Sequence, residues 1–355
     1  MKDSNYNQQK AEQFSEGLVD ILNKSAIALA LSLGHRCGIF AAMAELPAST
    51  SQQIADAAGL NERYVREWLG TMVTGRVVNY YPETQTYQLP AEHAAFLTNE
   101  CEFNLASSMQ FIPIMGQVED KLIGCFKNGG GLPYSEYPRF HEVMASESDQ
   151  TTVAALESHI IPLAPGLKEK LETGIDVLDI GCGSGRAMIT LASRFPNSRF
   201  AGYDFSEEGI SRARTEAKAL GLTNVRFEIR DAAAIGETEA YDLITSFDAI
   251  HDQANPAGML AGISQALRPD GTYLIQDIAG SSHVENNLEH PVGPFVYTIS
   301  LTHCMTVSLA YDGEGLGAMW GEEKAVEMLN KAGFKNVSKH KLEHDFMNTY
   351  YVATK

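Results

Sequence analysis

The stretch from Val177 to Gly185, VLDIGCGSG, limits most strongly what this chain can fold into. An apolar run suited to a buried strand passes directly into closely spaced glycines, and a segment with helical spacing begins at Arg186. Glycines let the backbone turn tightly and approach a ligand closely, and the N-terminal end of a helix stabilises a negatively charged group. The sequence therefore predicts a strand, a ligand-binding loop and a helix in succession.

The same alternation of strands and helices continues from residue 171 to the end of the chain. It predicts a mostly parallel sheet with helices on both faces, which is an α/β fold. The expected strands are 175–180, 199–203, 225–229, 241–247, 272–276, 337–341 and 346–353, and the expected helices are 186–195, 206–220, 256–267 and 322–332.

Acidic and aromatic residues stand where these strands end. Asp179 lies just before the glycines, Asp204 ends the second strand, and Asp231 follows the third, while Phe247 closes the fourth. Open α/β sheets bind ligands along this carboxyl edge, where a carboxylate can accept both hydroxyls of a ribose. A dinucleotide-binding loop would carry a glycine at Arg186. A nicotinamide-dependent oxidoreductase therefore remains an alternative that the spacing disfavours.

These residues together resemble the class I S-adenosylmethionine-dependent methyltransferases, over about residues 165–355. The resemblance implies a Rossmann-like sheet of seven strands with an antiparallel final strand, and S-adenosylmethionine as cofactor. It assigns the cofactor site residue by residue. Gly181, Cys182 and Gly183 would line the methionine end, Asp204 would bind the ribose, Asp231 and Ala232 would frame the adenine, Phe205 would pack on its ring, and Asp179 and Phe247 would complete the edge.

The segment after the fourth strand, FDAIHDQANP, contains the candidate catalytic residue, His251. It resembles the His-Asp-Trp segment of small-molecule O-methyltransferases, in which the histidine is the general base for a hydroxyl acceptor. An unperturbed imidazole has a pKa of about 6.5, which suits a base at neutral pH. Gln253 stands in place of the tryptophan, and no carboxylate partner for His251 is evident in the sequence. A histidine that only holds the loop by a hydrogen bond is an equal alternative.

The first hundred residues predict a separate helical module that ends in a β-hairpin, with a long buried helix at its start. Its helix-turn-helix and hairpin resemble a winged helix, which indicates either DNA recognition or a dimerisation or lid domain. Residues 1–100 hold 7 basic and 11 acidic residues, and the expected wing, residues 82–85, has no positive charge. Since DNA affinity depends on neutralising phosphates, the dimerisation or lid domain is favoured. A cofactor-sensing winged-helix transcriptional regulator remains the second alternative.

The expected organisation is thus a winged-helix-like domain over 1–100, a helical connector over 101–170 and a methyltransferase domain over 171–355. Residues 281–320 form an insertion that we expect to act as a lid over the acceptor. The family resemblance also implies a homodimer formed through the N-terminal domain.

Charge, apolar stretches and cysteine spacing indicate which kinds of binding partner and which cellular location to expect. A net charge of −18 disfavours nucleic acid and acidic membrane surfaces, so the expected partner is a small-molecule methyl acceptor. The N-terminus lacks an apolar signal core, and the longest apolar stretch, 26–33, is too short to cross a bilayer, which predicts a cytoplasmic protein with no membrane partner. The cysteines show no CxxC pair, and His283, His290, His303 and Cys304 match no ligand spacing, so no metal site is expected.

Overall fold

The chain divides into two compact units, Met1–Pro113 and Ile114–Lys355, in a computed structural model that describes residues 6–98 and 104–355. Each unit has its own hydrophobic core. Glu100 and Cys101, at the expected end of the first domain, lie outside the described residues.

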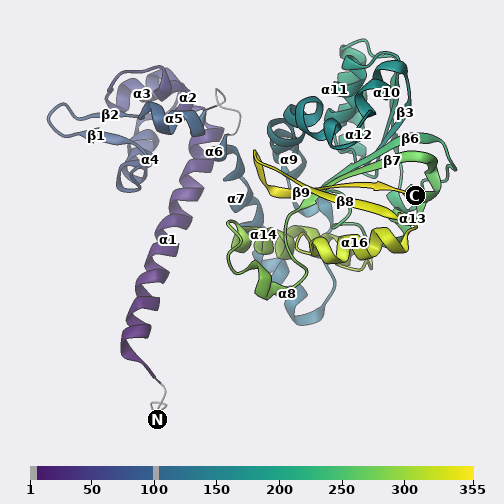
Figure 1. Ribbon diagram of the computed structural model, residues 1–355. Helices are drawn as coiled ribbons and strands as arrows, with labels where there is room; N and C mark the ends of the chain where they lie inside the picture. Colours follow the sequence, from purple (N-terminus) through teal and green to yellow (C-terminus); the bar gives the residue numbers. More distant parts are fainter. Residues whose placement is uncertain (1–5, 99–103) are drawn as a thin grey trace. The chain divides into compact units, whose positions relative to one another are not determined.

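The first unit is helical and carries one small hairpin (Figure 1). Thr50 and Gln53 form a capping box at the start of α3, and Gly59 ends this helix with a φ of 65°. The hairpin strands pair antiparallel, with Asn79 opposite Gln88. Its elements are α1 (Gln8–Arg36), α2 (Ile39–Ala44), α3 (Ser51–Ala58), α4 (Glu62–Thr74), β1 (Asn79–Tyr81), β2 (Thr86–Gln88), α5 (Ala91–Leu97), α6 (Leu105–Ser108) and the start of α7 (Phe111–Gly116).

Helix α1 differs from the prediction in its burial. Its C-terminal part packs in the core of the unit through Ala30, but the first half extends past the other helices of that unit (Figure 1). The expected core residues there are exposed, with Phe14 69% and Leu22 70% accessible, because no described element of the unit covers them. By length and composition α1 could also cross a membrane, and 17% of its apolar window is buried.

The second unit begins with helical segments that lead to the sheet. They include the remainder of α7, α8 (Glu119–Asn128), the 3-10 turn η1 (Tyr134–Glu136) and α9 (Phe140–Ser148). The π-helical turns η2 (Asp149–Val153) and η3 (Leu156–Ile160), η4 (Ile161–Leu163) and α10 (Leu167–Thr173) follow.

A seven-stranded sheet forms the centre of this unit, in the order β5-β4-β3-β6-β7-β9-β8. All neighbours are parallel except β9, which runs antiparallel to β7 and β8. The expected α/β fold with an antiparallel final strand is therefore confirmed. The strands are β3 (Asp176–Ile180), β4 (Arg199–Asp204), β5 (Val225–Ile229), β6 (Tyr241–Phe247), β7 (Leu267–Ile278), β8 (Asn336–Leu342) and β9 (Asp345–Thr354).

Helices cover both faces of the sheet (Figure 1). One core joins α10, α11 (Arg186–Arg194) and α12 (Glu207–Ala219) to one face, and another joins α13 (Pro256–Ala266) and α16 (Gly321–Lys331) to the opposite face. Because β3 is buried from both sides, four of its five residues are inaccessible, as is usual for a central parallel strand. The carboxyl ends of the strands are thereby held at one fixed edge.

The insertion between β7 and α16 is largely helical. A short 3-10 turn, η6 (Val284–Asn287), precedes α14 (Gly293–Ile299), the π-helical turn η7 (Ser300–Cys304) and α15 (Met305–Ala310). These three helical segments are contiguous and place Thr302, His303 and Thr306 in the interior.

Candidate active site

The glycine loop forms the floor of a pocket at the carboxyl edge of the sheet. Gly181, Gly183 and Gly185 have φ values of 74°, 52° and 72°, which L-residues with side chains rarely adopt. A Cβ atom on Gly181 would lie 2.4 Å from the Cβ atom of Ala249, so the loop has no room for a side chain there. The backbone is thus open to a ligand on one side and tightly packed on the other.

Asp204, at the end of β4, is hydrogen-bonded to the backbone of this loop. One carboxylate oxygen accepts a hydrogen bond from the backbone N–H of Gly183 at 2.8 Å, and the other accepts one from Ser206 at 2.8 Å. Burial raises the pKa of this carboxyl, while these backbone donors lower it. The side chain is thereby fixed at the edge of the pocket.

An open pocket lies above Asp204, about 890 Å³ when the solvent at its mouth is included, and an adjoining pocket shares part of its wall. Both are bounded by Gly181, Gly183, Phe247 and, from α9, Met144. Of the other expected cofactor residues, the first pocket is lined by Asp204, Phe205 and Ala232, and the second by Asp179 and Cys182.

Asp231 is placed differently. It is exposed, caps the 3-10 turn η5 (Ala232–Ala234) by accepting a hydrogen bond from Ala233 at 2.8 Å, and lines neither pocket.

Asp179 is a buried carboxyl, and within residues 6–98 and 104–355 its one side-chain donor is the hydroxyl of Thr245, at 2.7 Å. Burial raises its pKa to about 7, although the hydrogen bond from Thr245 acts in the opposite direction. A buried carboxyl of this kind gains most from a cationic ligand group, because a nearby positive charge stabilises the ionised form.

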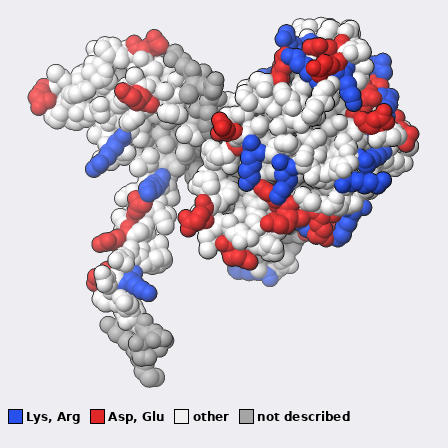
Figure 2. Space-filling view, in the orientation of Figure 1, with Lys and Arg blue, Asp and Glu red and all other residues white. Residues whose placement is uncertain are grey.

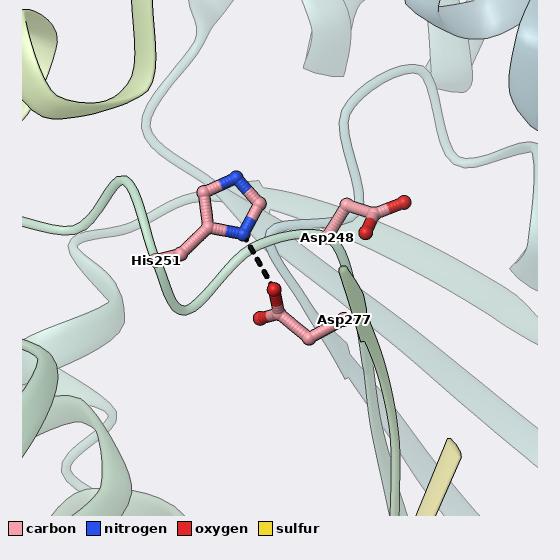
Figure 3. A group of neighbouring side chains, drawn as sticks. All are labelled: Asp248, His251 and Asp277. Carbon is pink, nitrogen blue, oxygen red and sulfur yellow. Dashed lines mark hydrogen bonds and ion pairs between the residues drawn. The ribbon is translucent and has the colours of Figure 1, made fainter. Parts of the chain in front are cut away.

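His251 has a carboxylate partner that sequence reasoning missed. Its Nδ1 lies 2.7 Å from Asp277 Oδ1, at the end of β7, and both side chains are buried (Figure 3). The same Asp277 oxygen accepts hydrogen bonds from the indole of Trp320 at 3.1 Å and from the backbone of Ile278 at 2.8 Å. Asp277 follows directly after the predicted strand 272–276, so its position at the carboxyl edge could have indicated it.

This pair has a defined electrostatic character. Burial lowers the pKa of His251, but Asp277 and the Cys304 thiol raise it, and the net result is well above the ordinary value. The contact with Asp277 orients the imidazole with Nδ1 toward the carboxylate, and the Cys304 thiol also hydrogen-bonds this imidazole. His251 lies behind the two pockets and lines neither of them.

Asp248, His251 and Asp277 also place ligand atoms within 4.8 Å of one another, which a metal ion could use. The carboxylate of Asp248 points away from the other two side chains in Figure 3, and His251 is engaged with Asp277. The expectation that this protein has no metal site remains a prediction.

Aromatic residues from the segment 131–148 form a further part of the pocket wall, although no ligand role was predicted for them. Tyr134 and Phe140 line the first pocket, and the hydroxyl of Tyr134 donates a short hydrogen bond to Asp252, next to His251. The irregular run of prolines and aromatics in this segment obscured its secondary structure. Their role became evident only from the fold.

Comparison with known families agrees with this geometry. A family described as a methyltransferase domain matches residues 171–333, and a family described as an Rv2258c-like winged HTH domain matches residues 25–99. This chain carries a methyltransferase domain. The predicted combination with an N-terminal winged helix is confirmed, and the cofactor of this family of domains is S-adenosylmethionine, as expected.

Similar proteins support the same family. Trans-aconitate 2-methyltransferase from Acidovorax sp. (strain JS42) is 28% identical over 153 residues, which is 43% of this chain and 55% of that protein. The chain thus matches about half of this curated relative's length.

Solved structures extend the likeness of fold over nearly the whole chain. Mitomycin 7-O-methyltransferase has a TM-score of 0.73 at 17% identity, with 98% of this chain and 100% of that chain covered. Human N-acetylserotonin methyltransferase, in complex with S-adenosylmethionine, has a TM-score of 0.71 at 15% identity, with 99% of each chain covered.

Proposed function

We propose that the protein transfers a methyl group from S-adenosylmethionine to a hydroxyl of a small molecule, with His251 as general base. The observation that carries this proposal is the buried pair of His251 and Asp277, which lies at the same edge of the sheet as the glycine loop. The family match favours an enzyme over the regulator and disfavours the oxidoreductase.

The cofactor site fits the residues present. We infer that Gly181, Cys182 and Gly183 hold the methionine end, because the two glycines let the backbone approach the ligand closely. Asp179 would neutralise the ammonium group, since its buried carboxyl has no cationic partner among the described residues. We assign the ribose hydroxyls to Asp204.

The adenine would lie between the end of β5 and the aromatic side chains of the pocket. Phe205 is 44% exposed, so its ring is available for stacking, and Phe247 closes the fourth strand beside it. We retain Asp231 and Ala232 as the adenine frame. Ala232 lines the pocket, and Asp231 would contribute through the turn that it caps.

The bound cofactor supplies an electrophilic methyl group on a positively charged sulfur. His251 would accept the proton of the acceptor hydroxyl at Nε2, and Asp277 would hold the imidazole in orientation and stabilise its positive charge. Positioning of reactants can lower a barrier by roughly 7–11 kcal/mol, and a positioned base typically contributes about 10²–10⁴-fold.

Replacement of the base tests this proposal. His251→Ala should reduce methylation of a responsive hydroxyl compound by about 10²–10⁴-fold, measured with radiolabelled S-adenosylmethionine, while S-adenosylhomocysteine still binds. His283→Ala, at an exposed histidine, is the control. Unchanged turnover in His251→Ala would leave the histidine with only the loop-holding role.

We also propose that the protein forms a homodimer in the cytoplasm and does not bind DNA. Helix α1 exposes apolar side chains at helical spacing along much of its length, which a second copy would cover: Phe14, Leu18, Ile21, Leu22, Leu29 and Leu33. The basic residues of this unit are partly neutralised, since Lys24, Arg63 and Arg66 each pair with a carboxylate on the same helix. On the face drawn in Figure 2, basic side chains of this unit are few and scattered.

A further inference from the structure

His303 is a buried histidine that the proposed reaction does not use. It lies in the π-helical turn η7 with 2% of its surface accessible, and neither ring nitrogen has a hydrogen-bond partner among the described residues. His251, which is also buried, has Asp277 as a hydrogen-bond partner. Leaving a buried polar atom unpaired costs about 1–3 kcal/mol, so a functional reason for this placement is needed.

Three aromatic rings surround His303. Phe140 stacks on it with ring centroids 3.5 Å apart and an interplanar angle of 11°, while Tyr134 and Tyr137 meet it edge-on at 5.0 and 4.7 Å. Burial lowers the pKa of His303 well below its usual value, and the neighbouring His141 and His251 add to this effect. The imidazole is therefore neutral and offers one donor and one acceptor.

His303 stands immediately behind the wall of the candidate active site. Tyr134 and Phe140, which contact its ring, both line the pocket above Asp204. Cys304, the next residue, interacts with His251. The π-helical turn that carries both residues is a distortion that occurs often at functional sites.

Resting on the function proposed above, we propose that His303 recognises the methyl acceptor. Its imidazole would hydrogen-bond a polar group of the acceptor other than the hydroxyl that His251 deprotonates. Phe140, which lines the pocket, would contact the flat apolar body of the molecule. The acceptor class is thus a neutral, planar hydroxy compound with a second hydrogen-bonding group on the ring system.

The acceptor would reach the imidazole by displacing Tyr134. The phenol ring of Tyr134 lies edge-on to His303, and its hydroxyl donates a hydrogen bond to Asp252. Tyr134 follows Gly129 and Gly130, whose φ values of 76° and 82° are conformations that favour glycine. An acceptor that takes over the hydrogen bond to Asp252 would move the Tyr134 ring aside and uncover the edge of His303.

Nearby carboxyls disfavour anionic acceptors. Burial and the charges of Asp204 and Asp277 raise the pKa of Asp252, although His251 and the hydrogen bond from Tyr134 lower it. An acceptor with a further negative charge would add to the repulsion between these carboxyls in a buried site. His303 can instead offer neutral hydrogen bonds to a neutral acceptor.

Two probes that differ by one ring nitrogen test this role: 8-hydroxyquinoline and 1-naphthol. Titration calorimetry on protein saturated with S-adenosylhomocysteine, with EDTA present, measures the Kd of each. We expect the wild type to bind 8-hydroxyquinoline at least about tenfold more tightly, because one well-made hydrogen bond contributes about 0.5–1.5 kcal/mol and an unmade one costs more. His303→Phe should bind both probes with equal affinity, while its Kd for S-adenosylhomocysteine and its Tm stay at or above the wild-type level.

His303→Gln, which keeps a donor and an acceptor, should retain part of the discrimination between the two probes. This variant replaces His303→Phe in the test if the latter does not fold. His283→Phe, at an exposed site, should behave as the wild type. The proposal is overturned if the wild type binds neither probe or does not discriminate, or if His303→Phe discriminates as well as the wild type. If the wild type does not bind S-adenosylhomocysteine, that result would instead contradict the proposed function itself.

Discussion

Single residues determine whether the glycine loop can exist. Gly181→Ala would place a Cβ atom 2.4 Å from Ala249 in a conformation with φ of 74°. Positive φ costs an L-residue about 1–2 kcal/mol before any clash is counted. We therefore expect the Kd for S-adenosylhomocysteine to rise by more than about tenfold, measured by calorimetry.

Gly221→Ala is the matched control for this substitution. Gly221 has a φ of 68°, but a Cβ atom there would meet nothing within 4 Å. Its substitution should lower Tm slightly and leave cofactor binding intact. Equal effects of both substitutions on the Kd would show that the close approach at Gly181 is irrelevant to the ligand.

The ionisation of His251 depends on Asp277. Because Asp277 raises the pKa of His251 and only the neutral imidazole can accept a proton, methylation should increase as the pH rises through that pKa. The stability that the ion pair contributes is present below pH 6.5 and is lost over the same rise.

Asp277→Asn removes the charge that raises this pKa. NMR titration of the His251 ring should show its midpoint at a lower pH by roughly 1 to 3 pH units, as expected for loss of an adjacent opposite charge. Asp270→Asn, at an exposed position on the same strand, should leave the midpoint unchanged. A midpoint unaffected by Asp277→Asn would mean that the two groups are not electrostatically coupled.

At the scale of elements, helix α9 is held over the pocket by a specific ion pair. Arg186, at the start of α11, donates two hydrogen bonds to Asp149 at 2.7 and 2.8 Å and one short bond to Glu216. Asp149 follows α9, whose Met144 and Ser148 line both pockets. The residue that distinguishes this loop from a dinucleotide-binding loop thus has a structural function.

Arg186→Met should release this contact. We expect amide hydrogen exchange in residues 140–153 to speed up, and the dissociation of S-adenosylhomocysteine to accelerate, by about three- to tenfold, since a partly exposed ion pair is worth roughly 1 kcal/mol. Arg194→Met, which breaks a more exposed pair with Glu157, is the control. If exchange in α9 stays at the wild-type rate, Arg186 does not secure that helix.

Local patterns predicted the elements of the sheet well, because each strand and helix is defined by its own periodicity. Strands β5 and β6 match their predicted ranges, and α11 ends within one residue of its prediction. Strand β7 begins at Leu267, ahead of the predicted range 272–276, and its pairing with β6 is shifted in this added part. Local patterns do not specify contacts between segments distant in the sequence, such as His251 with Asp277, although the place of Asp277 after a predicted strand put it at the same edge.

At the scale of the whole molecule, a single chain does not account for the apolar side chains that α1 exposes to solvent. The periodicity correctly predicted a long helix there, but not that its first half would lack a covering surface within the unit. Apolar spacing alone does not distinguish a helix buried in its own core from one covered by a second copy.

The dimer proposal makes this face testable. Sedimentation at micromolar concentration should show a dimer for the wild type, and Leu18→Glu with Leu22→Glu should shift the protein toward monomer by placing charges in an apolar interface. Glu16→Gln, on the same helix, is the control. A wild-type monomer would remove the proposal.

The most direct test of the account is calorimetric titration of S-adenosylhomocysteine into the wild-type protein and into Asp204→Ala. Asp204 holds the glycine loop and borders the pocket, so it should be required for the ribose. The account predicts saturable binding of one ligand per chain, weakened by at least about tenfold in Asp204→Ala. No heat with the wild type, or the same Kd in both proteins, would contradict it.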